Sequence, residues 1–331
     1  MASQPLTPLG IPLAGRSLDL TLLATVHAVD ALGQSIIHSL RGSPSDHLLP
    51  KPGHATPVLF VLASATIMHA WVYSPSRLPR GYRDWIFRAA DLDSRLLEAL
   101  RQARYGKFFY GRDTGIASLC GSLCKDLGLP EEWGDPARTI PLPCQVYHMG
   151  YKSCEVHALW RFSNAVKFAS KIYVPLQLLI LARTWLTRKR LRSQDFRKAI
   201  VGAGRSSTFL GGFIALFYYG VCLARTRLGP KLFSRKTISP QMWDSGLCIS
   251  AGGLLCGWSI LAEDVKRRTD VMLFVLHRAV AVWFPRRYDR QKLWKEHLAF
   301  SLSAAVLFTT IQERPERVRG MLGKILRQVY Q

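Results

Sequence analysis

Residues 243–262 read WDSGLCISAGGLLCGWSILA and contain one charged side chain, Asp244. The string that follows, EDVKRR at 263–268, is almost entirely charged. A helix of about 20 apolar residues is long enough to cross the ~30 Å hydrocarbon core of a bilayer. Residues 243–262 are therefore predicted to form a transmembrane helix, and this prediction decides the fold class.

Similar apolar stretches occur elsewhere, and connectors rich in Arg and Lys bound them, as is typical of membrane spans. The further predicted spans are 57–73, 168–186, 206–224 and, less purely apolar, 294–311. Residues 18–40 are also apolar, but His27, Asp30 and His38 make them too polar for a helix surrounded by lipid. Such a segment is expected to pack among other helices. The predicted fold is all-α, a multi-pass transmembrane helical bundle.

The chain is strongly basic, with 45 Lys and Arg against 22 Asp and Glu and a formal net charge of +23. In a soluble protein this excess would indicate nucleic-acid binding. Here the cations lie at the ends of the predicted spans, and no RNA-binding or zinc-finger signature accompanies them. Membrane lipids with anionic headgroups are therefore the expected partners, and nucleic acid is not.

An extramembrane region separates the first clear span from the second. Within it, residues 91–105 place leucines at helical spacing with arginines between them, which predicts an amphipathic helix that lies in the membrane interface or covers the bundle. The predicted division is an N-terminal helical segment with the first clear span (1–74), an extramembrane segment with this helix and a Cys/His group (75–165), a helical membrane domain (166–312) and a basic tail (313–331).

Small residues recur at four-residue spacing in two of the spans. The span 206–224 carries Ser207, Gly211 and Ala215, and the span 243–262 carries Gly246, Gly253 and Gly257. Small side chains at this spacing let two helix backbones approach closely, which favours association in lipid. We expect these residues to pack the two spans together. The alternative is that their small faces line a water-filled or substrate-passing groove.

The segment PCQVYHMGYKSCEVHALWRF at 143–162 holds the strongest candidate site. Its two cysteines and two histidines are Cys144, His148, Cys154 and His157. Zinc accepts two thiolates and two imidazoles in tetrahedral geometry, so these four residues are a candidate zinc site. A disulfide between Cys144 and Cys154, with Cys120 and Cys124 as other partners, is an alternative, and so are ordinary structural roles at a membrane entrance. No other cofactor is expected.

Two stretches of the chain resemble each other: LDLTLLATVHAV at 18–29 and TDVMLFVLHRAV at 269–280. A proline and an arginine also follow the next apolar stretch in each half, as Pro75 with Arg77 and as Pro315 with Arg317. This pattern favours an internal duplication, which is common in membrane transport folds. Chance likeness between apolar segments is the alternative.

The sequence contains no Walker loop, dinucleotide fingerprint, nucleophile elbow or H-E-x-x-H helix. No catalytic residue is predicted, and the chain is expected not to be an enzyme. A channel or carrier and a membrane-bound lipid-modifying enzyme are the alternatives. The latter needs only a few residues scattered over several helices.

Four blocks of sequence together resemble the transmembrane protein 135 family. They are the segment from Cys144 to Cys154 running into SNAVKFASKIYVPLQLL, the span RSSTFLGGFIALFYYGVCL, the block WDSGLCISAGGLLCGWSILAEDVKRR and the string SPSRLPRGYRDWI. The resemblance covers most of residues 18–331 and is strongest over 143–283. The membrane part of this family is similar to mitochondrial inner-membrane translocase channels and to a small peroxisomal membrane protein.

This resemblance implies a multi-pass protein of the peroxisomal membrane, or alternatively the mitochondrial membrane, with a role in organelle dynamics or lipid homeostasis. It implies a translocase-like character for residues 166–312, with helix-bundle scaffolding or solute passage as the mechanism. A second copy of the chain and other organelle membrane proteins are further expected partners. The family's cysteine-rich segment corresponds to Cys144, His148 and Cys154, although this chain is sparser in cysteine than animal members.

Overall fold

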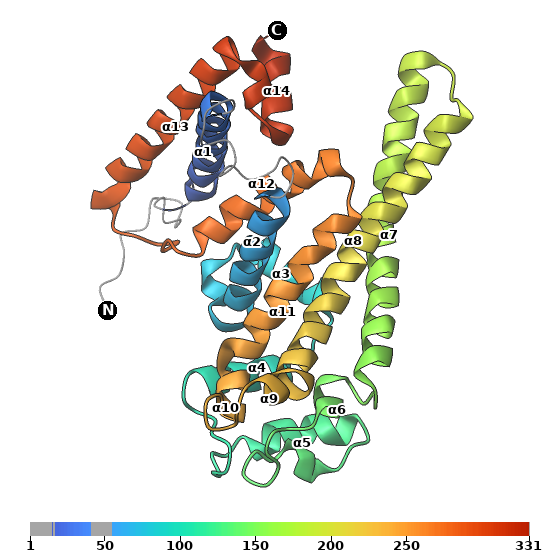
Figure 1. Cartoon of the computed structure of the whole chain (residues 1–331), viewed down its shortest axis with the longest axis vertical. Helices are drawn as coiled ribbons and strands as arrows, with labels where there is room; N and C mark the ends of the chain where they lie inside the picture. The colour runs from blue at the N-terminus through green and yellow to red at the C-terminus, as the bar shows by residue number, and fades with distance from the viewer. Residues whose placement is uncertain (1–14, 16, 41–54, 331) are drawn as a thin grey trace, which may run out of the picture. The chain divides into compact units, whose positions relative to one another are not determined.

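The computed structural model describes residues 15, 17–40 and 55–330, and every regular element within them is helical (Figure 1). The all-α prediction is confirmed. The expected segment 1–74 includes positions 1–14, 16 and 41–54, which lie outside the described residues, as does position 331 of the expected tail.

Five helical segments are long and apolar enough to cross a membrane. They are α1 (Leu18–Leu40), α2 (Ala55–Tyr73), α7 (Cys154–Arg188), the segment Ser193–Leu232 that begins with α8 (Ser193–Cys222), and the segment Pro240–Ala262 that contains α11 (Cys248–Gly257). The predicted spans 57–73, 168–186, 206–224 and 243–262 lie inside four of them. The chain therefore has the character of a multi-pass helical membrane protein.

For two segments the structure reverses the prediction of which one can span a membrane. Residues 294–311 do form a helix, α13 (Leu293–Glu313), but this helix is not among the candidate spans. Lys295 and Glu296 stand near its start and Glu313 at its end, which shortens its apolar stretch. Helix α1 is a candidate span despite its internal polar residues, and its His27 is buried.

The region between α2 and α7 consists of short helices. They are α3 (Arg80–Ala90), α4 (Ser94–Arg104), α5 (Ala117–Asp126), the 3₁₀ turn η3 (Glu131–Gly134) and α6 (Cys144–Tyr147). Helix α4 is the predicted amphipathic helix. It begins at Asp93, whose side chain accepts a hydrogen bond from the Arg95 backbone N–H, and it buries Leu96 and Leu100. Arg101 donates to the Val72 carbonyl at the end of α2, so α4 covers helices of the bundle.

Contacts divide the chain into two compact units. Unit 1 comprises the chain up to Ala63, Ser76–Leu78 and the residues from Val265 onward, and unit 2 comprises Ser64–Pro75 and Pro79–Asp264. Unit 1 contains α1, α12 (Val265–Ala281), α13 and α14 (Gly320–Tyr330). The expected division at 74, 165 and 312 concerns membrane placement and stays a prediction.

The two halves that resemble each other in sequence also share an order of elements. Helix α2 is followed by the 3₁₀ turn η2 (Pro75–Arg77) and α3, and α13 is followed by the 3₁₀ turn η8 (Pro315–Arg317) and α14. One residue precedes each 3₁₀ turn, Ser74 in one half and Arg314 in the other. The residue after each turn, Leu78 or Val318, is buried. The repeated turn carries the proline and arginine noted in the sequence, which supports duplication.

Helices α8 and α11 of unit 2 pack closely through two glycines. A Cβ atom at Gly220 would lie 2.9 Å from the Cα of Gly252, and one at Gly252 would lie 2.7 Å from the Phe217 carbonyl oxygen. Neither position has room for a methyl group. These two glycines were not singled out in the sequence, because each is one of 25 in the chain and the spacing does not show which face meets which helix.

The residues expected to pack the spans have other neighbours. A Cβ at Gly211 would lie 2.6 Å from Val166 of α7, and one at Gly253 would lie 2.8 Å from Ala65 of α2. Gly246 has φ +152° and lies beside Arg104 of α4, so a side chain there would strain the backbone. The remaining three are all buried: Ser207, Ala215 and Gly257.

Replacement of Gly220 by Ala is expected to destabilise the folded protein by about 1–3 kcal/mol, because the added methyl group would push α8 away from α11. The matched control is Gly204→Ala in the same helix, where a Cβ meets nothing within 4 Å. This control should be stabilising by about 0.5–1 kcal/mol, since Ala favours the helix over Gly. Thermal unfolding in detergent measures both, and equal melting temperatures would contradict the close approach.

Candidate metal centre

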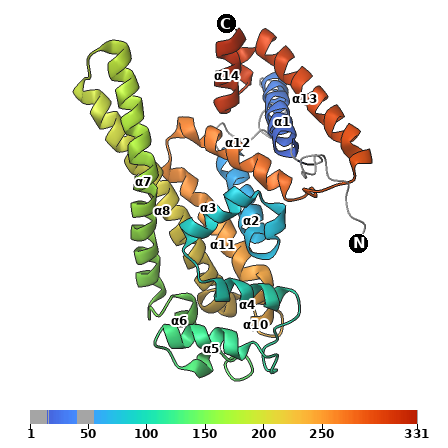
Figure 2. The ribbon, with the colours of Figure 1, turned by 180° about the vertical axis from the view of Figure 1, so that it is seen from behind.

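Four nitrogen and sulfur donors meet where the short-helix region between α2 and α7 joins α7 and α8. They belong to Cys144 in α6, His148 directly after α6, Cys154 at the first position of α7 and Cys222 at the last position of α8. One ligand atom from each residue lies within 4.8 Å of the others. Both views of the ribbon show α6 beside the ends of these two helices (Figures 1 and 2).

The local sequence brings the first three ligands together. Helix α6 is a single turn, and the His148 backbone N–H donates to the Cys144 carbonyl at 2.8 Å, which places these two residues one turn apart. Met149 and Gly150 then adopt positive φ values of 54° and 91° and turn the chain back. Helix α7 starts immediately afterwards, so its first residue, Cys154, faces the same point.

Hydrogen bonds orient the imidazole of His148. Its Nδ1 lies 3.2 Å from the Tyr151 carbonyl oxygen, and its Nε2 lies 2.9 Å from the Cys222 sulfur. A proton on Nδ1 is therefore held by a backbone carbonyl, which leaves Nε2 as the acceptor that faces the cysteines. Histidines that bind metal ions are oriented in the same way by a carbonyl or carboxylate behind the ring.

The structure places His157 outside this group. Its ring stacks on that of His148, with 4.8 Å between centroids, and its Nε2 accepts a hydrogen bond from Arg161 Nε at 3.1 Å. Arg161 in turn donates to the carbonyl oxygens of Ala90 and Asp91. His157 therefore supports the histidine that faces the cysteines, and Cys222 supplies the fourth donor.

Cys222 could not be recognised as a partner from the sequence. It lies in an apolar span far along the chain from the other three, where a thiol is read as a small apolar side chain. All seven cysteines are free thiols in the structure, including Cys120 and Cys124, which are buried in α5.

Three thiols and one imidazole match a Cys₃His zinc site in donor type and number. Zinc–sulfur bonds of about 2.3 Å place neighbouring sulfurs about 3.8 Å apart in a tetrahedron. The donor atoms, which lie up to 4.8 Å apart, would therefore have to approach one another by about 1 Å to bind one zinc ion. Four protein ligands leave no open coordination position. Such a site stabilises a fold and does not activate a water molecule.

The surroundings favour the thiolate form of Cys144. Hydrogen bonding between the Cys144 sulfur and Cys222 lowers the pKa of Cys144 well below its usual value, and the contacts of this sulfur with His148 and Thr226 and the nearby positive charge of Arg225 act in the same direction. Burial opposes this shift but is the smaller effect. In α5, by contrast, burial raises the pKa of Cys120 to about 12. The thiolate form, which metal binding requires, is therefore favoured at Cys144 and disfavoured at Cys120.

No protein-family model, curated protein or solved structure matches the chain.

Cys144 of metal-free protein is expected to react with iodoacetamide at pH 7 at least about ten times faster than Cys120, because a thiolate is the reactive form. After treatment with a chelator, mass spectrometry of the digested protein measures the alkylation of each cysteine over time. Added zinc should protect Cys144 and leave Cys120 unchanged. Reaction of Cys144 at the same rate with and without zinc would contradict the metal centre.

Proposed function

We propose that the Cys₃His group is a structural zinc site that fastens the extramembrane region to the membrane helices of a non-catalytic, multi-pass protein. The observation that carries this proposal is the meeting of four donor atoms within 4.8 Å from α6, α7 and α8. The hydrogen bond behind His148 supports it, because that bond orients the ring before a metal binds.

Zinc at this position would join three parts of unit 2. Cys144 and His148 hold the end of the short-helix region, Cys154 holds the start of α7, and Cys222 holds the end of α8. Because the ligands assemble only in the folded chain, the free energy of metal binding contributes to folding. The closed ligand set supports a structural role for this site.

We further propose that the protein resides in the peroxisomal membrane, with the mitochondrial membrane as the alternative, and acts in organelle dynamics or lipid homeostasis. The resemblance to the transmembrane protein 135 family supports this proposal. The turns η2 and η8, which repeat at matching places, bear on the mechanism alone, because duplicated helical units are common in membrane transport folds. Scaffolding by the helices or solute passage along them is the proposed mechanism.

Purified protein is expected to contain about one zinc ion per chain, measured by inductively coupled plasma mass spectrometry. The variants Cys222→Ser and His148→Ala should lose this zinc, because each removes one of the four donors. The matched control is Cys256→Ser, which removes a buried thiol of α11 that lies outside the group.

Full zinc content in Cys222→Ser would overturn the proposed ligand set. Absence of zinc from wild-type protein prepared with reduced thiols in zinc-supplemented medium would overturn the metal centre altogether. Thermal unfolding of the same samples should show that Cys256→Ser retains the increase in melting temperature produced by zinc, whereas Cys222→Ser does not.

A fluorescently tagged full-length chain is expected to coincide with a peroxisomal membrane marker in cells and to remain in the membrane pellet after alkaline carbonate extraction. Coincidence with a mitochondrial marker would select the alternative. A signal confined to the endoplasmic reticulum or plasma membrane would contradict both organelles, and release by carbonate would contradict membrane residence.

A further inference from the structure

A buried ion pair joins the end of α8 to the start of α11. Arg225 lies on the π-helical turn η4 (Leu223–Arg227), and Asp244 lies on η5 (Trp243–Leu247), a turn that is kinked at Gly246. Arg225 is 2% exposed and Asp244 is fully buried. Arg225 donates through Nε and Nη2 to the carboxylate, with 2.9 Å between Nη2 and Oδ2. The π-helical form of η4 is rare, and such turns are found frequently at functional sites.

The third nitrogen of the Arg225 guanidinium has no hydrogen-bond partner in the part of the chain that the structure describes. Nη2 also donates to the Tyr110 hydroxyl at 3.2 Å, and the guanidinium lies 4.0 Å from the centre of the Tyr147 ring. Nη1, however, is buried without a hydrogen bond to any described residue. A buried charged donor that lacks a partner is costly, so a site with this geometry indicates a missing acceptor.

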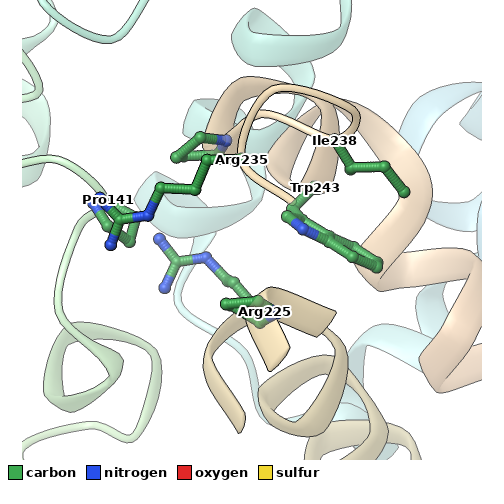
Figure 3. A pocket seen from close by; sticks show the side chains of 7 residues that line it. Pro141, Arg225, Arg235, Ile238 and Trp243 are labelled. Carbon is green, nitrogen blue, oxygen red and sulfur yellow. The ribbon is translucent and has the colours of Figure 1, made fainter. Parts of the chain in front are cut away.

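Arg225 lines a small pocket that is partly open to the surroundings. A second arginine, Arg235, also lines it, and Figure 3 shows both guanidinium groups on the same side of the pocket, toward Pro141. Asp244 balances the charge of Arg225, so Arg235 supplies the net positive charge. The side chain of Arg235 is exposed, whereas that of Arg225 is buried.

The rest of the lining is apolar. It consists of Pro141, Pro230, Ile238, Pro240 and Trp243. A free inorganic ion would gain nothing from this wall, whereas an amphiphile would place its acyl or glycerol part against it. The pocket also lies between the end of the candidate span Ser193–Leu232 and the start of the candidate span Pro240–Ala262, where lipid headgroups are found.

We propose that this pocket binds the phosphate of an anionic lipid headgroup, with Arg225 Nη1 and the Arg235 guanidinium as donors. Arginine binds phosphate oxygens through charge-assisted hydrogen bonds, and its planar geometry suits two oxygens at once. The proposed lipid is a phosphate monoester, because its terminal phosphate offers three non-bridging oxygens to the two arginines, whereas a phosphodiester offers two and carries less negative charge. The proposal rests on membrane residence and is independent of the zinc centre.

The test uses full-length protein in detergent micelles with three additives: dioctanoyl phosphatidic acid, dioctanoyl phosphatidylcholine and sodium phosphate. Phosphatidic acid is expected to raise the melting temperature saturably, because a ligand that binds only the folded state stabilises it. Phosphatidylcholine, which has the same chains but a zwitterionic headgroup, should have no saturable effect. An equal saturable effect of sodium phosphate would overturn the lipid as the ligand.

The variants must distinguish binding in this pocket from nonspecific electrostatic binding, because a chain of net charge +23 attracts any anionic lipid. Arg235→Ala should weaken phosphatidic acid binding about tenfold through the loss of one charge-assisted contact. The matched control Lys236→Ala removes the neighbouring exposed cation, which is not part of the lining, and should leave the affinity unchanged.

A second pocket variant, Ile238→Glu, places a carboxylate in the wall and should abolish binding. Equal weakening by Arg235→Ala and Lys236→Ala, or unaltered binding in Ile238→Glu, would overturn the proposal. Alkaline carbonate extraction of each variant tests membrane residence separately from lipid binding in the pocket. Retention in the membrane without preference for phosphatidic acid would overturn this site and leave membrane residence intact.

Discussion

The buried ion pair between Arg225 and Asp244 is the interaction on which this end of unit 2 depends. Two charges removed from water are stable only when they satisfy each other, and removal of one partner from such a pair costs about 3–5 kcal/mol. The pair fixes η4, which directly follows α8, against η5, which directly precedes α11. Cys222 immediately precedes η4, so the same pair positions the fourth donor of the metal centre.

Local composition determined how much of the structure could be predicted. Spans were recognisable because apolar length is a property of neighbouring residues, and Cys144, His148 and Cys154 could be grouped because one turn and one helix start bring them together. Cys222 could not be added to this group from the sequence, because it comes close to the other three donors only through the packing of α7 against α8. In the same way, Asp244 reads in sequence as the polar end of a span, and its partner Arg225 reads as part of a basic connector.

Unit 1 shows how related halves of a chain combine. Asp19 and Asp30 of α1 form ion pairs with Arg286 and Arg319, which lie in the other half of the repeat. The sequence indicated likeness between the halves but not these contacts between them, because Asp19 and Arg286, like Asp30 and Arg319, do not stand opposite each other in the alignment. The two ion pairs hold α1 against the segments that follow α12 and η8.

The order of the donors along the chain has a consequence for biogenesis. Three of them leave the ribosome together, whereas Cys222 follows only after all of α7 and α8 have been synthesised. Zinc could bind all four donors only after the hairpin of α7 and α8 has been inserted, with the end of α8 on the same side of the membrane as the start of α7. Metal capture would then be a late maturation step, available only to chains whose hairpin has the correct topology.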